Sequence, residues 1–248
     1  MIILRSSEEI GQIRKAGKIV ARVLARLKKG AKAGVTTKEL DRLAEDEIAK
    51  SGGYPAFKGY KGYPAAICAS INECVVHGIP SERRLNEGDL LSIDVGVRSG
   101  NFFADAAVTV GIGRISGDAD RLMKVTEEAL YRGIENAVPG KRLSDVSARI
   151  QSHVESNGFS VVRAFVGHGI GEKIHEEPEI PNFGSPNKGP RLEPGMILAI
   201  EPMVNAGTFE VQILDDGWTA VTKDRKASAH FEHTIAVRDG AAEILTSL

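Results

Sequence analysis

Two strand-like runs, each carrying one aspartate, are joined by a turn signal. Leu90–Val97 and Phe102–Val110 are rich in apolar and β-branched residues, and Ser99-Gly100 between them is a dipeptide typical of turns. If Ser99-Gly100 forms a two-residue hairpin turn, the resulting register places Asp94 directly opposite Asp105. The sequence therefore predicts an antiparallel hairpin from which two carboxylates project on one face.

Two carboxylates in this position need something to offset their charge. Directly opposed residues have Cβ atoms about 5 Å apart, and like charges so placed destabilise a sheet. A bound proton, a cation or solvent has to compensate. One interpretation is that both aspartates lie on a solvated face. The apolar neighbours Ile93, Val95 and Phe103 leave little polar surface for that interpretation.

A glycine-rich segment contains two histidines. His168 lies in VGHGIG, directly after the apolar run Val161–Val166, and His175 follows seven residues later in HEEP. Glycines beside His168 let a backbone or a ligand approach closely. A phosphate-binding loop is the alternative, but no Lys-Ser/Thr pair follows and Pro178 limits any helix. A single histidine in a loop is usually a surface residue, but two histidines in one glycine-rich loop indicate a functional site.

Two glutamates occur in or directly after apolar runs. Glu201 ends the run that starts at Met196, and a carboxylate there needs a partner or a metal unless the strand has already reached solvent. Glu232 falls within the strand-like run His230–Val237. Its neighbours on the same face would be His230 and Thr234, so by pattern alone His230 is as good a ligand candidate as Glu232.

Taken together, these segments carry four carboxylates and one imidazole on strands or at strand ends. Four carboxylates gathered without cations would repel one another and some would bind protons, whereas two divalent ions offset four negative charges. Such donors suit Co, Mn, Fe or Zn, and the lack of thiolates argues against a purely structural zinc. Two such ions can hold a hydroxide that attacks a carbonyl. The residues thus predict a metal hydrolase; a glycosidase using Asp94 and Asp105 without metal is the alternative.

The remaining periodicity predicts two helix pairs separated and followed by strands. Ser6 with Glu9, and Thr36 with Glu39, form candidate capping boxes at the start of the first two helices. The expected elements are helices at 6–27, 36–52, 120–138 and 144–156, a loop at 53–64, and further strands at 65–69, 161–166 and 196–200. This is the order that a duplicated α+β unit would have, as one catalytic domain over residues 1–248.

The composition excludes several classes of protein. The 248 residues include 32 basic and 33 acidic side chains, so no strong field points to nucleic acid or to an anionic membrane. The first residues carry early charges and no apolar run of signal-peptide length, and no stretch approaches a membrane span, so a cytoplasmic protein is expected. Cys68 and Cys74 are expected to be reduced thiols there.

The motifs IDVG, ADAAV, GHGIG, HEEP, IEP and FEHT, in this order, resemble those of the type I methionine aminopeptidases, in their short bacterial form. The upstream segment GYKGYPAAICASINECVVHGIP resembles the substrate-pocket segment of the same family, and the resemblance extends from about residue 3 to 245. It implies the α+β pita-bread fold, with two pseudo-symmetric halves of antiparallel sheet covered by helices and the site between them. It implies removal of the initiator methionine when the second residue is small, by attack of a metal-bound hydroxide.

The resemblance also implies roles for individual residues. Asp94 would bind one divalent ion, His168 and Glu201 the other, and Asp105 and Glu232 both. Glu201 would in addition move a proton from the bridging water.

The substrate-facing roles follow in the same way. His77 would meet the substrate near its amine or scissile nitrogen, and His175 would donate to the carbonyl oxygen as it becomes an oxyanion. An aromatic, sulfur-tolerant wall fits a thioether side chain. The expected pocket residues are Tyr60, Tyr63, Cys68, His77 and Trp218.

Some positions depart from the family pattern. Ile174 stands where relatives often carry Phe, which predicts a wider or less aromatic pocket. Ala104 and Ala106 flank Asp105 where some relatives have Gly and Thr, which predicts the loss of a hydroxyl beside the metal ligand. By resemblance, Asn72 and Ser228 would help to bind a monovalent cation.

Partners and rival functions complete the expectations. The predicted partner is the N-terminus of a nascent polypeptide, with no nucleic acid and no membrane; a monomer is expected, and contact with the ribosome is left open. One rival is an Xaa-Pro peptidase of the same fold, and another is a non-catalytic binding module that keeps the fold. The presence of all five ligands disfavours the binding module.

Overall fold

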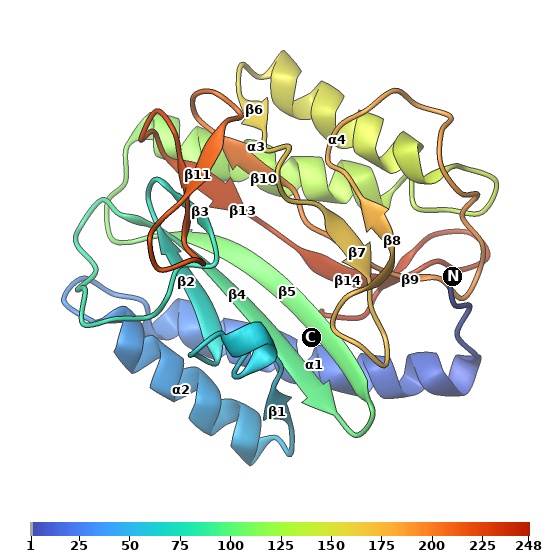
Figure 1. The fold of residues 1–248 in the computed structure, drawn as a ribbon, viewed down its shortest axis with the longest axis horizontal. Coiled ribbons are helices and arrows are strands. Elements are labelled where there is room, and N and C mark those ends of the chain that lie inside the picture. Colours follow the sequence, from blue (N-terminus) through green and yellow to red (C-terminus); the bar gives the residue numbers. More distant parts are fainter. Residues whose placement is uncertain (1) are drawn as a thin grey trace.

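The computed structural model describes residues 2–248, and Figure 1 shows its fold. In chain order the elements are α1 (Ser7–Gly30), α2 (Thr37–Lys50), β1 (Tyr54–Pro55), the 3-10 turn η1 (Tyr60–Gly62), β2 (Ile67–Ile71), β3 (Cys74–Val76), β4 (Leu90–Ser99), β5 (Phe102–Gly111), α3 (Gly117–Ile134), α4 (Leu143–Ser156), β6 (Ser160–Val161), β7 (Gly167–Gly169), β8 (Glu176–Ile180), β9 (Ile197–Ile200), β10 (Met203–Asn205), β11 (Val211–Ile213), β12 (Ala220–Thr222), β13 (Ser228–His230), β14 (His233–Ala236) and β15 (Glu243–Ile244). Both predicted helix pairs are present, with their ends shifted by a few residues.

The first two helices begin where their capping boxes predict. The Ser6 hydroxyl accepts from the Glu9 backbone N–H, and the Glu9 carboxylate accepts from the Ser6 N–H. Thr36 and Glu39 repeat this exchange at the start of α2. Each exchange satisfies two N–H groups that have no partner within the helix, so both capping predictions are confirmed.

Each half of the molecule combines a helix pair with antiparallel strands. α1 packs on β4 and β5, and α2 packs on β1 and β2, whereas α3 and α4 pack on each other and on strands of the C-terminal half. In Figure 1 the α1–α2 pair runs along the bottom of the molecule and the α3–α4 pair along the top, with strands between. The two largest sheets have the strand orders β1-β4-β2, with β5 paired to β4, and β15-β14-β9-β7-β8. The predicted α+β class is confirmed.

The hairpin turn between β4 and β5 lies one residue later than predicted. Gly100-Asn101 forms the turn, and Ser99 pairs with Phe102. Gly100 has a φ of 60°, which glycine adopts without steric cost at the first position of a type II′ turn. The predicted turn at Ser99-Gly100 is wrong because the glycine is needed at the first turn position, which moves the register of the whole hairpin by two residues.

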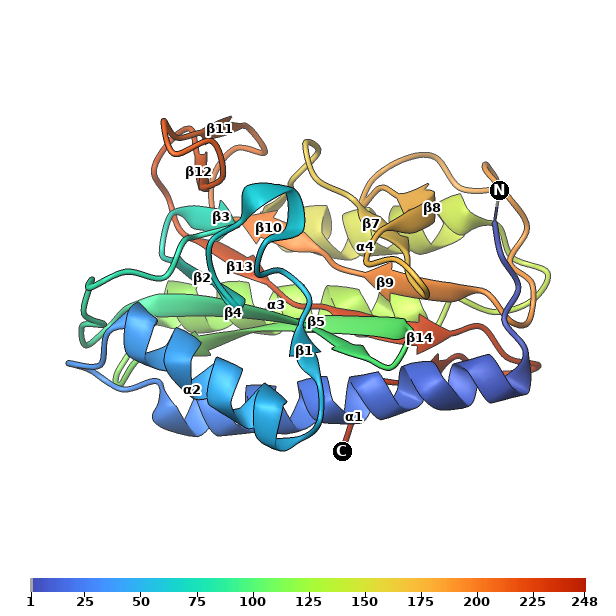
Figure 2. The same ribbon diagram turned by 60° about the horizontal axis from the view of Figure 1, so that its bottom comes forward.

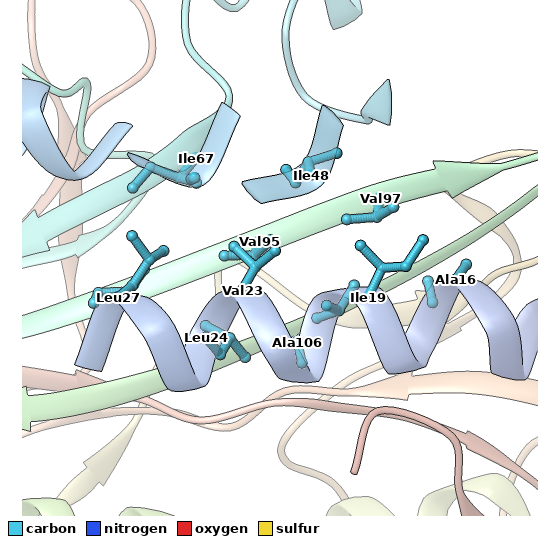
Figure 3. Packing of buried hydrophobic residues seen from close by; sticks show 14 of the residues in the cluster. Ala16, Ile19, Val23, Leu24, Leu27, Ile48, Ile67, Val95, Val97 and Ala106 are labelled. Carbon is cyan, nitrogen blue, oxygen red and sulfur yellow. The ribbon is translucent and has the colours of Figure 1, made fainter. Parts of the chain in front are cut away.

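One face of the hairpin is buried against α1. Val95 and Val97 of β4 project toward Val23 and Ile19 of the helix, as Figure 3 shows. Fully burying each such side chain contributes roughly 1.5–3 kcal/mol. In Figure 2, α1 and α2 lie below the β4–β5 layer and η1 lies above it. The other face of the hairpin is therefore free to carry polar side chains.

Two predicted strands are wrong in extent. Of the run Val161–Val166, only Val161 is in a strand, β6, where it pairs with Val204 of β10. The run His230–Val237 is interrupted between β13 and β14. In both cases the chain leaves the small sheet that contains β10 and enters the sheet that contains β9. An apolar run does not reveal such a change of sheet, because the hydrophobic pattern does not record that Arg163 and Ala164 are exposed where the chain leaves β6.

Within residues 2–248, no helix is both long and apolar enough to cross a membrane.

Candidate metal centre and adjoining pocket

The hairpin places two aspartates on the face away from α1. Asp94 pairs with Ala107, and Asp105 pairs with Gly96, so the two are diagonal neighbours and not directly opposed as predicted. Because side chains alternate with period two, a register shift of two residues leaves both carboxylates on the same face. The neighbours of Asp94 along the chain, Ile93 and Val95, point into the core. The prediction that Asp94 and Asp105 lie on one face is therefore correct, although the predicted register is wrong.

The C-terminal half brings three more side chains to this face. His168 lies at the centre of β7, Glu201 directly follows β9, and Glu232 lies between β13 and β14. Glu232 is not in the middle of a strand as predicted. Its backbone instead exchanges two hydrogen bonds with Ala107 of β5, from N–H to O at 2.9 Å and in return at 3.4 Å. This exchange joins the two halves at the site.

Side chains from both halves meet within a few ångströms. Nε2 of His168 lies 3.6 Å from Oδ2 of Asp105 and 3.5 Å from Oε1 of Glu201. One ligand atom each from Asp105, His168 and Glu232 lie within 4.8 Å of one another, and all three residues are buried. The structure therefore brings together Asp105 and Glu232, which are more than a hundred positions apart in the sequence, with His168 between them in the chain.

The tautomer of His168 follows from its hydrogen bond. Nδ1 lies 2.9 Å from the carbonyl oxygen of Gly169. A carbonyl can only accept, so Nδ1 carries the hydrogen and Nε2 presents a lone pair to the carboxylates. Burial lowers the pKa of His168 to about 4, so the ring is neutral near pH 7. This is the form in which histidine binds a metal ion.

Burial raises the pKa of each carboxyl group in the cluster. Three have a pKa well above the ordinary value because of burial first and the charge of neighbouring carboxylates second: Asp94, Glu201 and Glu232. For Asp105, burial raises the pKa to about 6. Oδ1 of Asp94 is also buried with no hydrogen-bond partner. A buried carboxylate oxygen without a donor, in a cluster of like charges, fits a site for cations.

A hydroxyl supports Asp105 from the facing strand. Oγ1 of Thr234, in β14, lies 2.9 Å from Oδ1 of Asp105, 2.8 Å from its carbonyl oxygen and 3.0 Å from its backbone nitrogen. The flanking Ala104 and Ala106 instead lie in the core beside α1. The hydroxyl that we expected to be missing beside Asp105 is thus supplied by another strand.

A cavity of about 250 Å³ adjoins the carboxylate cluster. Its lining residues are Phe57, Tyr60, Lys61, Tyr63, Cys68, His77, Asp94, Asp105, His168, His175, Glu201, Trp218 and Glu232. All the ligand, catalytic and pocket residues expected from sequence thus border one cavity. Phe57 and Lys61 were missed, although they lie beside Tyr60 in a segment whose glycines and aromatic residues indicated a loop.

Aromatic side chains form one wall of the cavity. The rings of Tyr63 and Trp218 meet edge to face with centroids 5.1 Å apart, and His77 meets Phe165 edge to face at 5.4 Å. Such pairs add stability beyond the area they bury. His77 has a φ of 59°, a left-handed conformation that is rare for a non-glycine residue. Strain of this kind often occurs at functional sites.

His175 lies at the cavity beside His168 and Tyr60. Its ring centroid is 4.4 Å from that of His168, and its Nδ1 lies 2.9 Å from the hydroxyl of Tyr60. Burial, followed by the charge of His168, lowers its pKa to about 4. The preceding Ile174 is buried in the core and does not itself line the cavity.

His230, an equal candidate to Glu232 by pattern, lies behind the cluster. Its Nε2 is buried with no hydrogen-bond partner and is 3.7 Å from Oε2 of Glu201. It does not line the cavity. The structure therefore separates the two candidates, with Glu232 at the cavity and His230 beside Glu201.

The chain resembles proteins of known class over its whole length. The model of metallopeptidase family M24 matches residues 11–239. A methionine aminopeptidase of Clostridium perfringens is 54% identical over 246 residues, which cover 99% of each chain. The crystal structure of a methionine aminopeptidase from Thermotoga maritima matches with a TM-score of 0.99 and 46% identity, covering 100% of each chain. A prolidase from Pyrococcus furiosus shares the fold, with a TM-score of 0.80 and 22% identity over 66% of its chain.

Proposed function

We infer that this chain, which belongs to metallopeptidase family M24, is a methionine aminopeptidase that removes the N-terminal methionine of polypeptides. The predicted pita-bread fold is confirmed by the match to solved methionine aminopeptidases. The observation that carries the function is the buried group of Asp105, His168 and Glu232 beside a cavity with an aromatic wall. Because both halves supply residues to this cavity, we treat residues 1–248 as one catalytic domain.

The carboxylate cluster would hold two divalent metal ions. Asp94 would bind one ion, His168 and Glu201 the other, and Asp105 with Glu232 both. The neutral His168, the raised pKa values of the carboxyl groups and the unpartnered Oδ1 of Asp94 support this assignment. When bound, the ions supply an activated water and polarise the scissile carbonyl. The donors are oxygen and nitrogen, which suits Co, Mn, Fe or Zn.

Three residues of the cavity would perform the proton and oxyanion chemistry. Glu201 borders the cavity beside His168 and would accept a proton and pass it to the leaving amine. His77 would contact the substrate near its amine or scissile nitrogen. His175 would donate from Nε2 to the developing oxyanion, which requires Nδ1 to accept from the Tyr60 hydroxyl. The 2.9 Å contact with Tyr60 is compatible with this tautomer.

The methionine side chain would occupy the aromatic part of the cavity. Tyr60, Tyr63, Cys68 and Trp218 line it together with His77. Burial raises the pKa of the Cys68 thiol, so the sulfur is neutral and suits an apolar ligand. We further propose that the residue after methionine is small, as the family resemblance implies.

Other assignments are part of the same proposal. A monovalent cation would bind near Asn72 and Ser228, whose backbones lie together, since the Ser228 N–H donates to the Asn72 carbonyl at 2.9 Å. The enzyme would act in the cytoplasm on nascent chains, as a monomer.

The proposal is tested by removing and restoring the metal. Chelator-treated protein is titrated with Co²⁺, Mn²⁺, Fe²⁺ and Zn²⁺ under reducing conditions, and release of methionine from Met-Ala-Ser is measured. An Asp105→Asn variant loses a ligand, whereas Asp118→Asn changes an exposed carboxylate on α3 as a control. We expect metal to restore hydrolysis in the parent and the control but not in Asp105→Asn.

The other outcomes separate the rival functions. Metal binding with hydrolysis of Xaa-Pro peptides in place of Met-Ala-Ser would support the proline-specific alternative. Metal binding with no hydrolysis of either would support the binding module. Hydrolysis of Met-Ala-Ser that survives complete chelation would overturn the metal mechanism, and chelator-resistant hydrolysis of a glycoside would support the glycosidase alternative.

A further inference from the structure

A buried arginine lies beneath the loop that carries His175. The side chain of Arg5 is 3% exposed, although the residue precedes α1 near the N-terminus. Its Nη2 lies 2.8 and 2.9 Å from the two carboxylate oxygens of Glu176, and its Nη1 lies 3.2 Å from Glu172 and from Glu9. The guanidinium therefore bridges the start of α1 to residues on both sides of His175.

The loop closes around this guanidinium. Oε1 of Glu176 also accepts from the Lys173 backbone N–H at 3.0 Å, and the Gly171 carbonyl accepts from Phe103 N–H at 2.8 Å. A Cβ at Gly171 would lie 2.5 Å from Nη2 of Arg5. A side chain at position 171 would thus clash with the guanidinium. The position of Arg5 therefore requires a glycine at position 171.

Arg5 is itself held on two sides. Its backbone N–H donates to the Gly195 carbonyl at 2.8 Å, and its guanidinium lies over the ring of Phe102, 5.7 Å from the centroid. Phe102 begins β5, the strand that carries Asp105. Figure 1 shows the N-terminal segment reaching from α1 toward β8 and β9. Arg5 therefore connects the loop that carries His175 to the β4–β5 hairpin and to the turn before β9.

General stability does not by itself explain such a residue. Burying an ion pair costs desolvation energy that often equals the attraction gained, so a buried pair is weak evidence for stability. A planar guanidinium instead restricts geometry, because its Nη2 contacts both oxygens of Glu176 while its Nη1 contacts Glu9 and Glu172, and a point charge cannot span these groups. Displacing a catalytic group by about 1 Å can cost about 100-fold in rate.

We propose that Arg5 is a positioning residue that acts through Glu176 to hold His175 at the reacting carbonyl. The inference rests on the proposed function, because it takes His175 to be the oxyanion donor. The Arg5–Glu176 ion pair would hold that donor in position. Arg5 lines neither the cavity with the metal ligands nor the adjoining hollow that Glu176 shares with His168 and His175, so Arg5 acts on the reaction through the loop.

Two variants break the ion pair from opposite ends. We expect Arg5→Met and Glu176→Gln each to lower kcat on Met-Ala-Ser about 10- to 100-fold, with KM changed less than about threefold. Arg5→Lys should recover only part of the loss, because the single nitrogen of an ammonium cannot contact Glu176 and also replace the separate contacts of Nη1 with Glu9 and Glu172. Arg14→Met, which removes the ion pair between Arg14 of α1 and Glu243, is the matched control and should retain parent kinetics.

A double-mutant cycle separates positioning from a general structural effect. In a His175→Ala background, Arg5→Met should cost less than about twofold, because the group that it positions is already gone. Metal affinity by calorimetry and the unfolding temperature are measured on every variant. We expect metal affinity within about threefold of the parent, since no metal ligand contacts Arg5. If Arg5→Met does not fold, Glu176→Gln replaces it in the double-mutant cycle with His175→Ala.

The outcomes are distinct for the two proposals. Parent protein that releases methionine, together with unchanged kcat in folded Arg5→Met and Glu176→Gln, would overturn the positioning role alone. Full additivity with His175→Ala, or loss of kcat explained by loss of metal, would also overturn it. Parent protein that binds metal but releases no methionine would overturn the proposed function itself.

Discussion

The hydroxyl of Thr234 contacts both the side chain and the backbone of Asp105, at distances of 2.8 to 3.0 Å. The two residues come from strands 129 positions apart in the sequence. This contact orients a ligand proposed to bridge two metals, and it lies at the junction of the two halves.

Thr234→Val keeps the shape of the side chain and removes the hydroxyl. We expect metal affinity to fall about 10-fold, the lower end of the effect of losing a hydrogen bond to a ligand. Calorimetric titration of Mn²⁺ measures it. Thr222→Val on β12 is the control, since that buried hydroxyl bonds the Lys226 carbonyl away from the site. Equal losses in both variants would contradict a specific role of Thr234.

Metal affinity should depend on pH through the carboxylates. Burial raises the pKa of Asp105 to about 6, so this group binds a proton as the pH falls through that value. The metal must displace the proton, so affinity should fall from about pH 7.5 to about pH 5 and binding should release protons. Calorimetry in two buffers of different ionisation enthalpy counts the protons. Affinity that is constant over this range would argue against Asp105 as a ligand.

Tyr60→Phe removes the hydroxyl 2.9 Å from Nδ1 of His175. If that hydroxyl fixes the tautomer that donates from Nε2, kcat should fall about 10-fold, which corresponds to about 1.4 kcal/mol in the transition state. KM should change little. Steady-state kinetics on Met-Ala-Ser measures both, and Tyr54→Phe at an exposed position of β1 serves as the comparison. A change confined to KM would place Tyr60 in substrate binding alone.

Trp218→Ala opens the aromatic wall of the cavity. The indole packs edge to face on Tyr63, so its loss should weaken binding of the methionine side chain and raise KM about 10-fold. Phe209→Ala, at a partly exposed residue just before β11, should leave KM unchanged. An unchanged KM in Trp218→Ala would remove the indole from the methionine pocket.

Gly17→Ala tests how α1 is seated against the C-terminal segment. A Cβ at Gly17 would lie 2.2 Å from the Leu245 carbonyl oxygen, a backbone atom that cannot move freely. We expect a loss of about 1–3 kcal/mol in the free energy of unfolding. At Gly11, in the same helix, the nearest atom is Nη1 of the Arg14 side chain at 4.0 Å, so Gly11→Ala should stabilise the protein by roughly 0.5–1 kcal/mol. Denaturant unfolding of both variants compares them directly.

Local signals predicted the parts of the fold that depend on local contacts. The capping pairs at Ser6 and Thr36 mark the helix starts because both partners lie within three residues. The alternation along β4 and β5 assigns Asp94 and Asp105 to one face even though the turn lies one residue later than expected. The face on which each side chain lies does not depend on that error, because a register shift of two residues keeps every side chain on the same face of the sheet.

Patterns of hydrophobicity were less informative where the chain changes sheets. The run Val161–Val166 and the run His230–Val237 read as continuous strands, but each passes from one sheet to another. Burial makes both sides of such a crossing apolar, so periodicity contains no sign of it. The pocket residue Phe57 was missed for a related reason, since its place at the cavity depends on how a loop folds over the hairpin.

By itself, the sequence determined the helix pairs, the faces of the hairpin and a set of residues suited to bind metal. Only the tertiary structure decided which of these residues meet: it set Glu232 at the cavity and His230 behind it, brought Thr234 to Asp105, and placed Arg5 beneath the loop of His175. The physical reason is range. Helix caps and strand alternation arise between near neighbours, whereas a buried charge cluster exists only where the packing of two halves excludes water from residues far apart in the chain.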